Sequence, residues 1–123
     1  MAIFTVLSNK TYEAKRFDFS IGVPIPVGLS EVTIMAKRDN WPDSLDNVID
    51  ILIDISFDGG LTWIDGFIGF TARGGEVYDE FGQLMTYSFA TCRLPQPENN
   101  NRLARGRMIS KVPIKTELSI EVK

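Results

Sequence analysis

The feature of this chain that most limits its fold is a stretch in which every second residue is isoleucine. Between Val48 and Phe57, isoleucine occupies positions 49, 51, 53 and 55. Successive side chains of a β-strand point to opposite faces, so an extended chain places all of these isoleucines on one apolar face. A helix would spread them around its circumference, and β-branched side chains favour strands. The stretch therefore predicts a strand with one face in a hydrophobic core.

Strand signals continue along the rest of the chain. Further strands are predicted over 3–7, 13–21, 31–38, 62–71, 84–93 and 114–122, with 103–110 as an additional candidate. In the second of these segments, alternation places Phe17, Phe19 and Ile21 on one face. In the fifth, it points Tyr87 toward the core together with Phe89.

The spacing of these strands predicts the fold class. Seven to eight short strands separated by turn-forming residues indicate an all-β fold, an antiparallel β-sandwich, and a jelly roll is one topology of that class. No crossover helices are apparent, which argues against an α/β fold, although 44–48 and 76–82 each leave room for one short helix. The length of 123 residues is close to that of a typical domain, so a single domain over residues 1–123 is expected. The order of the strands stays open.

Composition excludes several kinds of chemistry. The chain has no histidine and one cysteine, Cys92, which rules out a Ser-His-Asp triad, a His-bound zinc and an intrachain disulfide. Aspartates crowd residues 43–65, but Asp50 and Asp54 would stand roughly 13 Å apart along one strand face. No calcium-binding loop motif is present. We therefore expect a solvated acidic face, no metal, no cofactor and no enzymatic activity, a small hydrolase being the least favoured alternative.

One short motif has a specific structural meaning. Residues 56–63 read S-F-D-G-G-L-T-W and match the pattern S-x-D-x-G-x-T-W at every fixed position. This resembles an Asp-box, a hairpin motif known from sialidases and other β-propeller repeats, where it is structural. Aspartate accepts hydrogen bonds from turn amides and glycine supplies positive φ. The motif therefore predicts a structural turn made by Ser56, Asp58, Gly59, Gly60, Thr62 and Trp63.

Charge is segregated along the chain beneath a formal net charge of −3. Residues 39–80 contain ten acids and one base, whereas residues 93–115 contain six bases and one acid. Arg102, Arg105 and Arg107 form a compact cluster that is a candidate for partner binding through electrostatic complementarity. The alternatives are neutralisation within the chain and, less favoured, phosphate binding. A pI near 4.9 argues against a nucleic-acid partner.

Trp41 is the other candidate for partner binding. It lies between polar residues in a loop and is followed by Pro42, which disfavours a helix at that position. An exposed tryptophan there would suit stacking on a sugar. The competing interpretation is a plug that covers one end of the sandwich, because tryptophan is usually well buried.

The whole chain resembles small accessory proteins of tailed-bacteriophage virions, such as head decoration or cement proteins. The resemblance is carried by chain-wide alternating strands, the loops at 22–28 and 94–101, and the amphipathic segment 114–122. It implies a structural role without catalysis, a homo-oligomer on the assembly, the major capsid protein or another virion protein as partner, and a place in the virion assembled in the host cytoplasm. A carbohydrate- or receptor-binding module and a tail or neck protein are the alternatives. No secretory signal or membrane-spanning run is visible, so no membrane association is expected.

Overall fold

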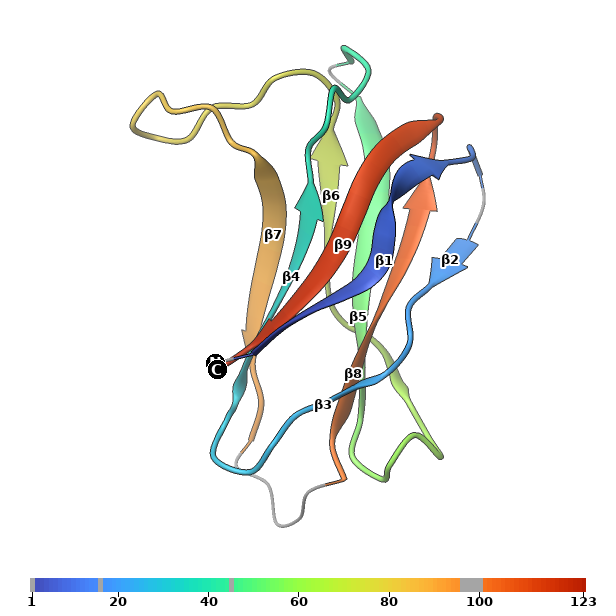
Figure 1. The fold of residues 1–123 in the computed structure, drawn as a ribbon, viewed down its shortest axis with the longest axis vertical. Helices are drawn as coiled ribbons and strands as arrows, with labels where there is room; N and C mark the ends of the chain where they lie inside the picture. The colour runs from blue at the N-terminus through green and yellow to red at the C-terminus, as the bar shows by residue number, and fades with distance from the viewer. Residues whose placement is uncertain (1, 16, 45, 96–100) are drawn as a thin grey trace.

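The computed structural model describes residues 2–15, 17–44, 46–95 and 101–123, and this part of the chain is all-β (Figure 1). Its strands are β1 (Ala2–Tyr12), β2 (Phe17–Phe19), β3 (Val23–Pro24), β4 (Glu31–Lys37), β5 (Asn47–Ser56), β6 (Ile64–Arg73), β7 (Tyr87–Arg93), β8 (Leu103–Ser110) and β9 (Ile114–Val122). Among the described residues, no helix is long and apolar enough to cross a membrane.

The strands form two antiparallel sheets in jelly-roll order. One, here the β9 sheet, has the order β1-β9-β4-β7; the other, the β5 sheet, has the order β2-β8-β5-β6. β2 and β3 both pair with β8, so they act as one interrupted strand, and the described chain then has eight strands. In that count the first strand pairs with the eighth, the second with the seventh, the third with the sixth and the fourth with the fifth. This is a jelly roll, and the predicted antiparallel sandwich is confirmed.

The core lies between the two sheets and contains the isoleucines of β5. Positions 49, 51, 53 and 55 are all fully buried, as are Ile34 of β4 and Leu118 of β9. The sheets pack closely at Gly106, where an added Cβ would lie 2.7 Å from Leu118 Cδ2 and 2.8 Å from Ile34 Cδ1. Glycine is therefore required there by close packing of side chains from the opposite sheet.

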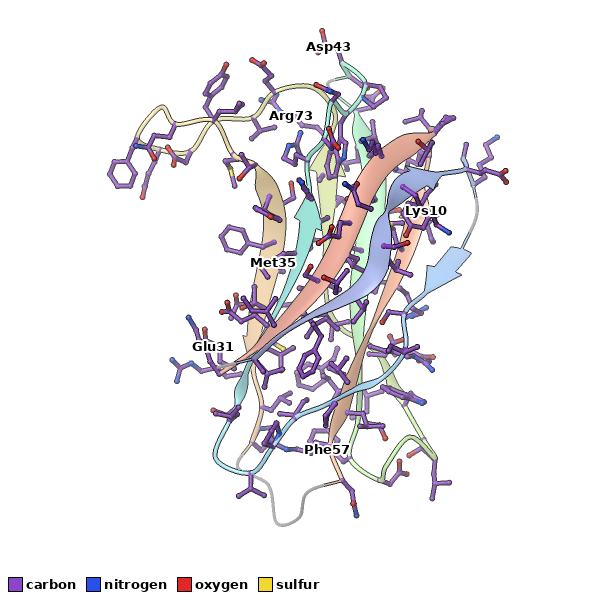
Figure 2. All side chains as sticks on the ribbon, viewed as in Figure 1. Lys10, Glu31, Met35, Asp43, Phe57 and Arg73 are labelled. Atoms are coloured by element: carbon purple, nitrogen blue, oxygen red, sulfur yellow. The ribbon has the colours of Figure 1, made fainter. Side chains whose placement is uncertain are left out.

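β7 faces the opposite way from the prediction. Ala90 is paired with Ile34, and residues directly opposite each other in a sheet point to the same face, so Ala90 turns inward with Ser88 and Cys92. Tyr87 and Phe89 are consequently exposed on the outer face, opposite Lys37 and Met35. Met35, on the neighbouring strand β4, is labelled in Figure 2. The prediction that Tyr87 faces the core is wrong. Each face of β7 carries residues that a core accepts, so the sequence pattern does not say which face is buried. Pairing with β4 decides it.

Two other local predictions have different outcomes. The side chains of Phe17 and Phe19 lie outside those that the structure describes, so their predicted grouping with Ile21 stays a prediction. Ile21 itself is exposed. The sequence leaves two segments open for a short helix. Most of the first, 76–82, forms part of a hairpin that is described below. The other, 44–48, includes residue 45, which is outside the described residues, and its last two residues begin β5.

Candidate functional site

The basic cluster of β8 is neutralised inside the molecule. Arg105 Nε lies 2.9 Å from Asp54 Oδ2, and Arg107 Nε lies 2.9 Å from Asp54 Oδ1. The Gly66 amide donates to the same carboxylate at 2.8 Å. Asp54 is fully buried, so the expectation of a solvated aspartate is corrected: the two guanidinium groups and the amide replace its water.

Arg105 also joins this cluster to the motif turn. Its guanidinium stacks 4.2 Å from the centroid of the Trp63 ring, and its Nη2 lies 3.5 Å from Asp65 Oδ1. Cation–π and ionic contacts together hold β8 against the start of β6. Arg105 and Arg107 therefore bind an aspartate of their own chain, which agrees with the alternative of charge neutralisation within the chain.

Arg102 has an internal role. Its side chain is 1% exposed, and its guanidinium donates to the backbone carbonyls of Pro26 at 3.1 Å, Leu29 at 2.6 Å and Pro95 at 3.3 Å. Burial lowers the pKa of Arg102 below its ordinary value. The expectation that Arg102 contacts a partner is therefore corrected. Its guanidinium connects the loops at one end of the sandwich, and the side chain is buried.

The Asp-box segment forms a closed turn between β5 and β6. The Asp58 carboxylate accepts from the Thr62 amide at 2.9 Å, the Thr62 hydroxyl and the Ser56 hydroxyl at 2.8 Å. Gly59 and Gly60 have φ of 74° and 93°, which favour glycine. These hydrogen bonds, those from Thr62 foremost, lower the pKa of Asp58 to about 2. The arrangement leaves the carboxylate occupied by its own turn.

Trp41 is the plug at the end of the sandwich that lies opposite this turn. It is 5% exposed, and its Nε1 donates to the Lys115 carbonyl at 2.9 Å. The Arg38 guanidinium covers the indole at 4.3 Å from the ring centroid. Because the ring face is already stacked by Arg38, the indole is not a free platform for a sugar.

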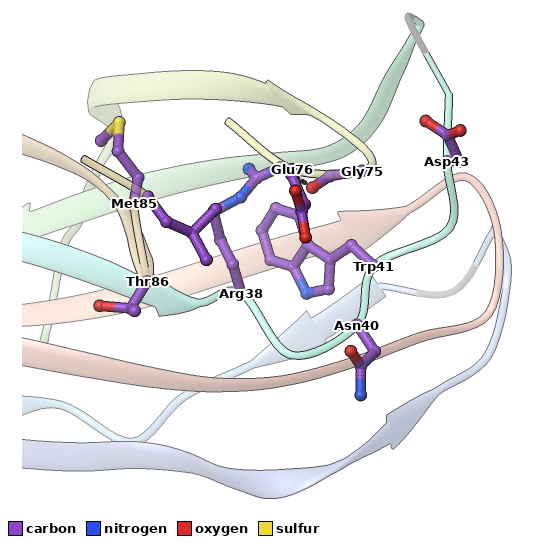
Figure 3. A pocket seen from close by; sticks show the side chains of 9 residues that line it. Arg38, Asn40, Trp41, Asp43, Gly75, Glu76, Met85 and Thr86 are labelled. Carbon is purple, nitrogen blue, oxygen red and sulfur yellow. Dashed lines mark hydrogen bonds between the residues drawn. The ribbon is translucent and has the colours of Figure 1, made fainter. Parts of the chain in front are cut away.

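This stacked pair lines part of a pocket of about 570 Å³, and Figure 3 shows the side chains around it. It is lined by Arg38, Asn40, Trp41, Asp43, Gly75, Glu76, Leu84, Met85 and Thr86. Arg38 donates to Ser88 Oγ at 2.8 Å and to the carbonyls of Arg73 at 2.7 Å and Gly75 at 2.9 Å. Burial and then the nearby charge of Arg73 lower the pKa of Arg38. The pocket has polar groups of both signs and could hold a small polar ligand.

A hairpin arm borders this pocket, and the sequence interpretation missed it. It spans Val77–Met85, with the Met85 amide donating to the Val77 carbonyl at 2.8 Å and a bridge between Tyr78 and Leu84. The Asp79 carboxylate accepts from the amides of Phe81 and Gln83, both at 2.9 Å. The available signal was Asp79 three residues before Gly82, which is the residue preference of a type I turn.

The arm and β7 expose a group of large apolar side chains, here called the apolar surface. Its members are Tyr78, Phe81, Leu84, Tyr87 and Phe89. Phe81 stands at the tip of the arm and is 80% exposed. The Tyr78 hydroxyl donates to Glu76 at 2.7 Å, and this hydrogen bond together with the Glu76 charge raises the pKa of Tyr78. The hydrogen bonds to Asp79 fix the backbone at Phe81, so the tip of the arm is preorganised.

Comparisons with known proteins add little to this geometry. No family model and no curated protein matches the chain. Among solved structures, the chain is similar to the carbohydrate-binding module TmCBM61 in complex with beta-1,4-galactotriose, with a TM-score of 0.45 and 10% sequence identity. The match covers 90% of this chain and 64% of that chain. A likeness of this size carries no argument about function.

Among the described residues, no three acidic or cysteine side chains gather as a metal site would require.

Proposed function

We propose that this chain is a non-enzymatic structural protein of a virion, of the head decoration type, that works by binding other proteins of the assembly. The observation that carries the proposal is the apolar surface on the arm and β7. Large apolar side chains exposed on neighbouring elements of a fold mark sites of protein contact. Aromatic residues are enriched in such contacts, and four of the five members are aromatic.

The rigidity of the arm strengthens this interpretation. Phe81 is exposed at the tip, yet the backbone beneath it is fixed by the bonds to Asp79 and by the Val77–Met85 pairing. Binding through a preorganised segment costs less conformational entropy than binding through a disordered one. An anchor of this kind suits a protein that must dock onto a repeated surface, and we assign as partner the major capsid protein or another virion protein.

The proposal is tested by sedimenting the tagged chain with purified virion particles from its own source. The wild-type chain is expected to sediment with the particles, and Phe81→Ser is expected to lose this binding. Leu61→Ser is the matched control, because Leu61 is 86% exposed against 80% for Phe81 but lies in the turn between β5 and β6. Failure of the wild-type chain to bind, or equal loss in both variants, would overturn the proposal.

The alternative of a carbohydrate- or receptor-binding module is favoured by a different observation, the pocket beside Trp41. Its lining includes donors and acceptors from Arg38, Asn40 and Glu76, which is the chemistry that binds hydroxyl-rich ligands. A glycan array tests this function. Hits that disappear in Asn40→Ala and Glu76→Gln but persist in Phe81→Ser would support it, and an array without hits would reject it.

A further inference from the structure

The edge strands of the two sheets differ in how they are protected against pairing with another chain. β1 carries register shifts between Thr5 and Leu7 and between Leu7 and Lys10. β2 and β3 are short, and β3 ends in Pro24. The pairing of β6 is also interrupted by register shifts, and Gly66 within it has φ 62°. Short strands, bulges, proline and charge are the usual means of blunting an edge.

β7 has none of these protections between Tyr87 and Cys92. Its seven residues pair with β4 in unbroken register, from Arg93 opposite Glu31 to Tyr87 opposite Lys37. From Tyr87 to Cys92 the strand contains no charged residue, no proline and no glycine. An edge with unbroken register and no charge from Tyr87 to Cys92 is a template for strand addition.

The hydrogen bonds at the ends of β7 show which of its backbone groups are free to pair. The Arg38 amide donates to the Thr86 carbonyl at 2.8 Å, and the Leu94 amide donates to the Ser30 carbonyl at 2.7 Å. Hydrogen-bonded pairs recur at every second residue of an antiparallel ladder, so the even-numbered residues of β7 direct their amides toward β4. The amides and carbonyls of residues 87, 89, 91 and 93 therefore point to the open side of the sheet.

We propose that β7 pairs antiparallel with β7 of a second copy of this chain, about a twofold axis at Ala90. The inference rests on the proposed function, because it names one of the partners that the apolar surface takes. In this register residue 87 lies opposite residue 93 of the second copy, and residue 89 lies opposite residue 91. All outward-pointing backbone groups are then paired, and the two β9 sheets, four strands from each copy, become one continuous sheet.

The distribution of charge around β7 fits a second copy. Three acidic residues precede the first residue of β7 by seven to eleven positions in the chain: Glu76, next to the arm, and Asp79 and Glu80 within it. Arg93 lies at the opposite end, where its Nη2 lies 3.4 Å from Glu31 Oε2 of its own chain while its side chain stays 81% exposed. Antiparallel pairing would bring the exposed Arg93 of each copy toward the acidic residues that precede β7 of the other, and the twofold axis would repeat this contact at both ends.

The direction of the arm fits the same arrangement. Figure 1 shows the arm extending outward past β7, on the side where the second copy would lie. Each arm would then pass over the neighbouring copy and cover Phe81, Leu84 and Tyr78 against it. The same apolar side chains that stand in solvent in one copy become buried in the pair, which is the driving force for association.

Analytical ultracentrifugation of the purified chain over a range of concentrations tests the pairing. A monomer–dimer equilibrium is expected, and Phe89→Lys is expected to raise its dissociation constant by at least about tenfold, because charge on a sheet edge opposes pairing. Ile3→Lys on β1 is the matched control: Ile3 is 58% exposed and Phe89 is 57% exposed, on opposite edge strands of the same sheet. A monomer at all concentrations, or an equal effect of both variants, overturns the pairing.

Hydrogen exchange locates the interface and separates this inference from the proposed function. At dimer concentrations the amides of residues 87, 89, 91 and 93 are expected to exchange more slowly, whereas a dimer without this protection would overturn the β7 interface. A chain that stays monomeric yet sediments with particles overturns the pairing and leaves the proposed function standing. A dimer protected at β7 that does not sediment with particles supports the pairing and overturns the proposed function.

Discussion

The outer side of the β5 sheet buries a charged group, whereas the β7 side of the molecule exposes apolar ones. On the β5 sheet, the Asp54 carboxylate is fully buried and held by two arginines of β8. On β7 and the arm, aromatic side chains stand in solvent. The difference teaches that residue type alone does not decide burial. A charge is buried where its partners lie on the neighbouring strand, and an aromatic side chain is exposed where the chain offers nothing to cover it.

The largest expected effect is on the buried carboxylate. Asp54→Ala leaves Arg105, Arg107 and the Gly66 amide without their acceptor, and loss of one member of a buried ion pair costs about 3–5 kcal/mol. The lower end is expected, since the arginines keep some solvent contact. Urea unfolding measures the change. Asp50→Ala on the same strand is the control, with an expected loss below about 0.5 kcal/mol; equal losses would contradict the network's role.

The next effect concerns Arg102, which tests whether the basic cluster is internal. Arg102→Met keeps the length of the side chain but removes the donors to the carbonyls of Pro26, Leu29 and Pro95. Destabilisation of about 2 kcal/mol is expected, because buried carbonyls lose their partners. Chemical denaturation gives the stability. Particle binding by the folded variant is expected to match that of the wild type, and a stable variant that no longer binds would reverse the assignment.

Loss of an exposed aromatic side chain on the arm should change stability much less than loss of a buried charged group. Phe81→Ser removes a large side chain from the tip of the arm, where it contacts solvent, so unfolding stability is expected to change by no more than about 0.5 kcal/mol. Thermal melting of both proteins at the same low concentration provides the measurement. A large loss of stability would show that Phe81 packs against its own chain and would remove it from the apolar surface.

The smallest effect concerns the exposed turn of the Asp-box and depends on pH. The folded pKa of Asp58 is about 2, below the ordinary value of 3.8, so its ionised form is favoured by the fold. The stabilisation is therefore fully present above pH 3.8 and is lost as pH falls toward 2. The difference in melting temperature between the wild type and Asp58→Asn should shrink across this window. A difference that stays constant there would exclude the carboxylate's charge as its source.

Local patterns predicted the strands well where one face was apolar and the other polar. The isoleucines of β5 and the segment 114–122 belong to this kind, and both form strands that bury the expected face. The turn at Asp58 was equally accessible, since its hydrogen bonds join residues within the motif itself. In β7, by contrast, each face carries residues that a core accepts. The choice was made by β4, which places Ala90 opposite Ile34.

The candidate site was less accessible to sequence reasoning than the fold. Arg105, Arg107 and Trp41 stood out as exposed binding residues because charge clusters and loop tryptophans often are. Their actual roles depend on partners far away in the chain: Asp54 is more than fifty residues from Arg107, and the Lys115 carbonyl is still farther from Trp41. The arm gave only a weak local signal, the turn from Asp79 to Gly82.

By itself the sequence determined that this chain forms an antiparallel β-sandwich with an Asp-box turn, because alternation and turn chemistry act between residues close in the chain. Only the tertiary structure decided the jelly-roll order, the burial of Asp54 and the outward face of β7. Strand order and burial arise from pairing between segments far apart in sequence, and no local pattern records which strand becomes a neighbour. For the same reason only the folded chain shows that β7, which is uncharged from Tyr87 to Cys92, is an edge strand.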